Sequence, residues 1–211
     1  MSIESLIKNF ERAQIEAFFV QNRDMARELA LEIIEKRRTL CAKKPKELRI
    51  SWGGSKTLDE CGIREALSER YNTLDPYALP KEEQNEAKRQ ALLSDVFLMS
   101  ANAICESGEI VNIDGNGNRL GALIYGPDMV IIVAGKNKIV PTLKDAYARI
   151  KKVACPKNAQ RLNRATPCAQ EGVCGNCYIE GQTICAHTVV TRFSTIKDRI
   201  KVIIVDEELG F

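Results

Sequence analysis

Apolar residues recur every three to four positions near the start of the chain, which is the spacing of an amphipathic helix. Residues 5–19 and 23–38 each place their apolar side chains on one helical face, so we expect an N-terminal helical segment over residues 1–42. The stretch Lys43-Lys44-Pro45 ends the second helix, because proline does not continue a helix. The chain therefore starts with helices and reaches its first predicted strand at residue 48.

Beyond this segment, short apolar strands alternate with helices. The pattern predicts strands at 48–52, 72–74, 95–100, 103–105, 110–113, 129–134, 184–191 and 200–205, and helices at 58–68, 80–93, 117–125 and 141–152. The run at 129–134 is continuously apolar, as in a strand covered on both faces, and the strands around Ser107-Gly108 form a hairpin. This alternation predicts an α/β fold with a mainly parallel sheet flanked by helices, in a single domain over residues 1–211.

Two glycine-rich turns follow predicted strands and precede predicted helices. One is the sequence SWGGS at 51–55, and the other is DGNGN at 114–118, which leads into Arg119. Free backbone amides and the positive end of a helix dipole bind anions, and arginine pairs with carboxylate or phosphate. If both turns meet at the carboxyl ends of the strands, they form a pocket for a small anionic metabolite. The predicted ligand-binding residues are Gly53, Gly54, Ser55, Asn102, Asp114, Asn116, Asn118 and Arg119.

Each of these residues also has an ordinary structural explanation. Glycine, asparagine and aspartate are favoured in turns for backbone reasons alone, Ser55 can cap a helix, and Arg119 can be a solvated residue at a helix start. The argument for a pocket therefore rests on the density of polar side chains. Lys136 and Lys138 follow the strand 129–134, where parallel sheets bind ligands, and an exposed loop lysine is the alternative. Catalytic residues stay unassigned, because the sequence contains no hydrolase triad and no Walker-type loop.

Composition and charge exclude several classes of protein. The chain has 211 residues, 45% of them hydrophobic, within the range of one globular domain. Its 31 basic and 28 acidic residues give a net charge of +3 without a basic stripe, so we expect no nucleic-acid partner. No apolar run approaches the roughly 20 residues that cross a bilayer, and the N-terminus lacks the apolar core of a signal peptide. We expect a cytoplasmic protein with no membrane contact, and the composition is compatible with a homo-oligomer.

The eight cysteines should be reduced in the cytoplasm, so their clustering points to a metal or to reactivity rather than to disulfides. Five lie in a Cys-rich insertion over 155–186, and four of these follow the spacing C-x5-C-x2-C-x7-C. The predicted metal ligands are Cys168, Cys174, Cys177 and Cys185, with Cys155 and His187 as substitutes. Four thiolates can hold an iron-sulfur cluster or a structural zinc ion, and the sequence does not decide between them. A surface loop of free thiols is the alternative.

Four sequence blocks carry a resemblance to a known family. They are SWGGSKTLDECGIREAL at 51–67, DVFLMSANAICESGEIVNIDGNGNR at 95–119, VIIVAGKNKIV at 130–140 and TPCAQEGVCGNCYIEGQTIC at 166–185. On these blocks the chain resembles the short, stand-alone members of the LUD-domain (lactate utilisation, DUF162-type) family over essentially its whole length. The resemblance implies a fold similar to the NagB/RpiA/CoA-transferase-like superfamily and an association with the oxidation of lactate to pyruvate.

The central block is also similar to methylthioribose-phosphate isomerase and its translation-factor relatives. A Gly-Ala-Asp step of those proteins is replaced here by Ser100-Ala101-Asn102, and an amide cannot exchange a proton as a carboxyl group does. The resemblance therefore implies a binding pocket rather than that isomerase chemistry. We expect a protein that takes part in the oxidation of lactate or a related organic acid together with partner subunits. A stand-alone sugar-phosphate or acyl-coenzyme A enzyme and a metabolite-sensing module are the alternatives, and whether the chain is an enzyme stays open.

Overall fold

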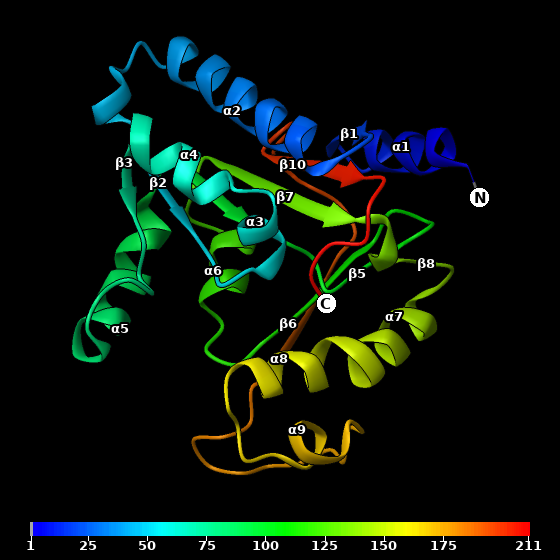
Figure 1. Ribbon diagram of the computed structural model, residues 1–211. Helices are drawn as coiled ribbons and strands as arrows, with labels where there is room; N and C mark the ends of the chain where they lie inside the picture. The colour runs from blue at the N-terminus through cyan, green and yellow to red at the C-terminus, as the bar shows by residue number, and fades with distance from the viewer. Residues whose placement is uncertain (1) are drawn as a thin grey trace.

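The computed structural model describes residues 2–211, and its central element is a six-stranded sheet in which all strands run parallel (Figure 1). The strands follow the order β1 (Glu16–Val20), β10 (Ile200–Val205), β7 (Met129–Gly135), β4 (Val96–Met99), β2 (Arg49–Trp52) and β3 (Asn72–Leu74). All residues of β4, β7 and β10 are buried. These strands are apolar along their whole length because helices cover both faces of the sheet.

Two apolar layers hold the helices to this sheet. On one face, α2 (Arg23–Leu40), α3 (Lys56–Glu60) and α4 (Ile63–Arg70) pack on a core that contains Trp52 and Ile131. On the other face, α1 (Ile3–Arg12) and α6 (Asn118–Ile124) pack on a core that contains Phe97 and Ile132. The helix α5 (Lys81–Gln90) is polar, with Ala87 as its only fully buried side chain. Figure 1 shows the helices lying along both sides of the sheet.

A second, four-stranded sheet carries the rest of the chain. Its order is β8 (Ile139–Val140), β5 (Ala103–Cys105), β6 (Ile110–Asp114) and β9 (His187–Thr191). The helix α7 (Leu143–Arg149) packs on it and continues through one π-helical turn into α8 (Cys155–Arg161), which is followed by the short α9 (Pro167–Glu171). A third apolar cluster, which includes Cys105, Ile150 and Cys155, joins this sheet to α7 and α8.

The predicted α/β fold with a mainly parallel sheet is confirmed, but two local predictions were wrong. The helix predicted over 5–19 ends at Arg12, and residues 16–20 form β1 beside β10. Gln14 has a φ of 58°, which a helix cannot accommodate. The helix predicted over 58–68 is interrupted at Gly62, whose φ is 63°, and becomes α3 and α4. The predicted hairpin is confirmed, and its strands β5 and β6 lie in the second sheet.

The two strands that follow the cysteine segment do not both extend the parallel sheet. We expected closing strands after the cysteine segment, and two strands are present there, but they belong to different sheets. The strand β9 pairs with β6, while β10 lies between the edge strand β1 and β7 in the parallel sheet. None of the helices within residues 2–211 has the length and apolar character needed to cross a membrane.

Candidate functional site

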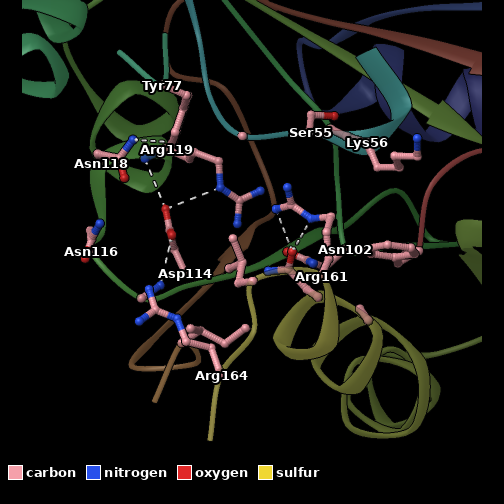
Figure 2. Close-up of a pocket in the computed structure, with 18 of the residues that line it drawn as sticks. Ser55, Lys56, Tyr77, Asn102, Asp114, Asn116, Asn118, Arg119, Arg161 and Arg164 are labelled. Atoms are coloured by element: carbon pink, nitrogen blue, oxygen red, sulfur yellow. Dashed lines mark hydrogen bonds and ion pairs between the residues drawn. The ribbon is translucent and has the colours of Figure 1, made fainter. Parts of the chain in front are cut away.

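A cavity of about 360 Å³ lies where the carboxyl ends of the central strands meet. The segments that leave β2, β4 and β7 line it with Ser55, Ser100 and Lys138 respectively. Because parallel strands end at the same edge of a sheet, segments that are far apart in the sequence meet there. The helix α8 and the residues 181–184 close the opposite side. Figure 2 shows the labelled side chains arranged around this cavity.

The first glycine-rich turn makes a close approach to the second. Gly54 and Ser55 line the cavity, whereas Gly53 is buried beneath the side chain of Arg119. A Cβ atom on Gly53 would lie 2.4 Å from both Cγ and Cδ of Arg119. Ser55 caps α3, since its hydroxyl accepts a hydrogen bond from the amide of Leu58 at 3.3 Å. Only glycine at position 53 therefore lets the arginine side chain lie across this turn.

The second turn is organised by one carboxylate. Asp114 accepts hydrogen bonds from the amides of Gly115 at 2.9 Å and Arg119 at 3.1 Å, and it lies 3.4 Å from Nε of Arg119. The Arg119 guanidinium also donates to the carbonyl of Ile113 at 2.7 Å. Asp114 and Arg119 thus orient one another, as Figure 2 shows, and both side chains still reach the cavity. The charge of Asp114 is balanced within the turn.

The amide side chains of the predicted site have different roles. Asn116 is exposed at the cavity wall, and Asn118 donates to the hydroxyl of Tyr77 at 3.4 Å. Asn102 accepts a hydrogen bond from the amide of Ile113 at 2.9 Å, so its carbonyl oxygen fixes β6. All eight predicted ligand-binding residues except Gly53 line one cavity. Whether they bind a ligand is a separate question, which a binding experiment has to answer.

The helices that follow the two glycine-rich turns are short. The helix α3 has five residues and α6 has seven, so each is too short to sum many peptide dipoles. The positive charge comes from side chains instead. Six basic residues line the cavity, against Asp114 as its single acidic residue among those described: Lys56, Lys88, Arg119, Lys138, Arg161 and Arg164. Of these six, Arg119 was predicted as a ligand-binding residue and Lys138 was a candidate, whereas the other four were not identified from the sequence.

The two arginines at the far wall are held by local contacts. Arg161, at the end of α8, donates to Oδ1 of Asn158 through Nε at 3.1 Å and Nη2 at 2.8 Å. Arg164 donates to the carbonyl of Gly181 at 2.9 Å. Burial lowers the pKa of Arg161, and the neighbouring charges of Arg64 and Arg119 act in the same direction. A guanidinium group in this position is stabilised when an anion binds beside it, because the anion offsets both the cost of burial and the repulsion from the neighbouring positive charges.

The lysines after β7 point in different directions. Lys136 is exposed and forms an ion pair with Asp206 at 2.9 Å, so it is the ordinary loop lysine that the sequence allowed. Lys138 is buried, with 3% of its surface exposed, and its amine lies 2.8 Å from the hydroxyl of Thr57 and 2.9 Å from that of Ser100. The sequence places both lysines after the same strand, and only the tertiary structure distinguishes them.

The cysteine segment forms part of the cavity wall. Gly181, Thr183 and Ile184 line the cavity, and the amide of Ala186 donates to the carbonyl of Asp114 at 3.1 Å. The backbone of Ile184 packs against Gly115. The segment that carries the cysteines and the turn that carries Asp114 are therefore one structural unit, although the sequence separates them by more than sixty residues.

The thiols of this segment are spread over several environments. Cys168 is buried beside Thr166, the sulfur of Cys174 lies 4.0 Å from Asn176, and that of Cys177 lies 3.7 Å from the hydroxyl of Thr183. Cys185 packs with Cys155, whose thiol donates to it and lowers the pKa of Cys185 to about 6. Within residues 2–211, no group of three His, Cys, Asp or Glu side chains is arranged to hold a metal ion.

His187, the other substitute ligand, lies on β9. It pairs with Asp114 in the second sheet and is exposed, and its ring lies next to Gly117. Its position is that of a strand residue at the rim of the second turn. The metal site predicted at Cys168, Cys174, Cys177 and Cys185 thus stays a prediction.

Comparison with known proteins agrees with this architecture. The family model described as "LUD domain" matches residues 3–205. A DUF162 family protein from Deinococcus radiodurans is similar in structure, with a TM-score of 0.52 and 13% identity over 96% of this chain and 95% of that chain. The eIF2B beta subunit from Chaetomium thermophilum matches 52% of this chain and 42% of its own, with 15% identity and a TM-score of 0.33. No curated protein matches the chain.

Proposed function

The chain belongs to the LUD-domain family, which is associated with lactate utilisation, and from that premise we propose that its basic cavity binds a small anionic metabolite. The ligand would carry a carboxylate or a phosphate group. We further propose that the protein acts in the cytoplasm in the oxidation of lactate or a related organic acid. This proposal joins a general family association to the charge of one cavity.

The observation that carries the proposal is the charge around the cavity. Six basic side chains face a space of about 360 Å³, and the single acidic one is already paired with Arg119. Guanidinium groups bind carboxylates and phosphates through two parallel hydrogen bonds. Arg119 reaches the cavity from α6, and Arg161 and Arg164 reach it from the end of α8 and the residues just after it. Such a cavity attracts an anion and repels a cation.

Oxidation of lactate releases two electrons, and the chain needs a partner to accept them. The sequence contains no dinucleotide-binding fingerprint. We propose that partner subunits accept both electrons. Cys168, Cys174, Cys177 and Cys185 would hold an iron-sulfur centre, which would supply one-electron transfer. A zinc ion at the same cysteines would instead stabilise the cavity wall. Either metal would give the cysteine segment a role, and analysis of the metal content of the purified protein distinguishes iron from zinc.

Isothermal titration calorimetry with lactate, pyruvate, inorganic phosphate and a sugar phosphate tests the binding function. A charge-assisted hydrogen bond is worth about 1.5–3 kcal/mol, so Arg161→Gln or Arg164→Gln should weaken binding by roughly 10- to 100-fold. The matched control is Arg12→Gln, which removes the same charge from the exposed end of α1, away from the cavity. Equal affinities for all three variants would show that the cavity is not the binding site.

Turnover assays and thermal melting with the same ligands separate the two other functions. Turnover of a sugar phosphate or an acyl-coenzyme A by the purified chain would identify a stand-alone enzyme. Binding that raises the melting temperature without any turnover would identify a metabolite-sensing module. The environment of Lys138 favours an enzyme over a metabolite-sensing module.

A further inference from the structure

The strongest unexplained feature of the cavity is a lysine that has no acidic partner. Lys138 is buried at the carboxyl end of β7, lines the cavity, and has no carboxylate within ion-pair distance among residues 2–211. Lysine is rarely fully buried unless it is paired. Protonation of a buried amine among basic neighbours costs free energy. A lysine at this position therefore calls for a functional explanation.

The hydrogen bonds around the amine fit its uncharged form. Ser100 donates its hydroxyl proton to the carbonyl of Val133 at 2.6 Å, and Thr57 donates to the carbonyl of Leu209 at 3.4 Å. Both hydroxyl oxygens therefore accept from Lys138, at 2.9 Å and 2.8 Å. The part of the chain that the structure describes offers no third acceptor to this nitrogen. An ammonium group has three protons to place, whereas a neutral amine has two and keeps a free electron pair.

The charged groups around Lys138 act mostly in the same direction. Burial is the largest effect, and together with the positive charges of Arg149 on α7 and Arg119 on α6 it lowers the pKa of Lys138 to about 7. Glu60 at the end of α3 and the neighbouring Cys61 oppose this effect. At pH 7 about half of such amines are unprotonated, against fewer than one in a thousand for an ordinary lysine with a pKa near 10.4.

We propose that Lys138 is a nucleophile that forms a Schiff base with the carbonyl carbon of an anionic carbonyl compound held by the cavity arginines. The substrate class is a 2-oxo acid or a phosphorylated ketone, which share a carbonyl group next to an anionic group. The inference rests on the proposed function, because the arginines have to hold the anionic group while the amine attacks. Desolvated lysines next to cationic groups are activated in this way.

The step balances without any other reagent. The nitrogen electron pair attacks the carbonyl carbon, and a carbinolamine forms. Both N–H protons leave with the carbonyl oxygen as one molecule of water, and a carbon–nitrogen double bond remains. Ser100 and Thr57 accept these N–H groups beforehand, so they orient the amine and its electron pair.

Reductive trapping tests the proposal on the whole protein. The chain is incubated with pyruvate or with dihydroxyacetone phosphate, sodium borohydride is added, and the labelled peptide is identified by mass spectrometry. We expect one adduct per chain, on Lys138, with a yield that rises through about pH 7. Lactate in place of pyruvate should give no adduct, because it has no carbonyl group. Excess inorganic phosphate should reduce the yield by competing for the arginines.

Two variants and peptide mapping of the wild-type adduct keep the test valid even if one variant fails to fold. Lys138→Arg should abolish the adduct, and Lys144→Arg, which alters an exposed lysine on α7, should retain it. Mapping of the wild-type protein is independent of any variant. An adduct on Lys56 or Lys88, or equal labelling of surface lysines, would overturn the proposal. If calorimetry detects anion binding to the cavity and Lys138 is unlabelled, only this inference fails; if no anion binds, the proposed function fails as well.

Discussion

Substitution of Gly53 by alanine should disconnect the two turns that form the cavity. The new Cβ would lie 2.4 Å from Cγ and Cδ of Arg119, which is 1.0 Å less than the 3.4 Å at which ordinary contact begins. The arginine stem lies in a crowded place, since its side chain is only 13% exposed. Arg119 therefore has to leave its present position.

The displacement breaks specific contacts of Arg119. The hydrogen bond to the carbonyl of Ile113 at 2.7 Å and the ion pair with Asp114 at 3.4 Å both depend on the present path of the side chain. A hydrogen bond from a charged donor is worth about 1.5–3 kcal/mol. We therefore expect Gly53→Ala to lower the free energy of unfolding by about 2 kcal/mol. In a chain of this length that corresponds to a fall of roughly 4–8 °C in melting temperature.

Anion binding should fall together with stability. Arg119 would no longer reach the cavity from the same side, and loss of one charge-assisted contact weakens binding by roughly 10- to 100-fold. Urea denaturation measures the first effect, and calorimetric titration with inorganic phosphate measures the second.

The neighbouring glycine provides the matched control. A Cβ on Gly54 would lie 3.5 Å from the ring and hydroxyl of Tyr77, which is ordinary van der Waals contact, and neither glycine has a positive φ. Gly54→Ala should therefore leave stability close to that of the wild type. If Gly53→Ala matched Gly54→Ala in both measurements, the close approach of Arg119 to the first turn would not matter, and the reasoning would be refuted.

Two further predictions concern a buried carboxylate and the cysteine segment. Burial alone would raise the pKa of Asp95, but the hydrogen bonds from Lys43 and from the amide of Arg49 outweigh it and leave the pKa below the ordinary value of 3.8. Asp95 therefore contributes stability that is present above pH 3.8 and is lost as the pH falls through the folded-state pKa. By urea denaturation, Asp95→Asn should cost about 2 kcal/mol at pH 7 and progressively less as the pH falls below 3.8. A cost that does not change with pH would contradict this. Protein purified without oxygen should contain either iron with acid-labile sulfide or one zinc ion, and Cys174→Ala/Cys177→Ala should lose it while Cys41→Ala, at the end of α2, keeps it. If metal analysis detects neither metal in the wild type, the cysteine segment is a wall of the cavity and no more.

The sequence determined the class of fold and most of the turns. Continuous apolar runs such as 129–134 are strands covered on both faces, and their alternation with amphipathic helices permits few arrangements other than a parallel sheet. The same periodicity misassigned residues 16–20, because alanine and phenylalanine side chains at those positions continue a helical face as well as they fill a strand. Pairing with β10, which is about 180 residues away in the chain, decides that β1 is a strand.

The polar turns were visible in the sequence because turn chemistry is local. Glycine, asparagine and aspartate favour turns because of their local backbone preferences, so the residues around Gly54 and Asp114 could be identified one segment at a time. The basic residues could not, because Lys56, Arg161 and Arg164 are ordinary charged residues in their own segments and become a site only when the ends of parallel strands meet. The lowered pKa of Lys138 likewise depends on its burial in the folded chain, and its hydroxyl partners Thr57 and Ser100 come from two distant segments.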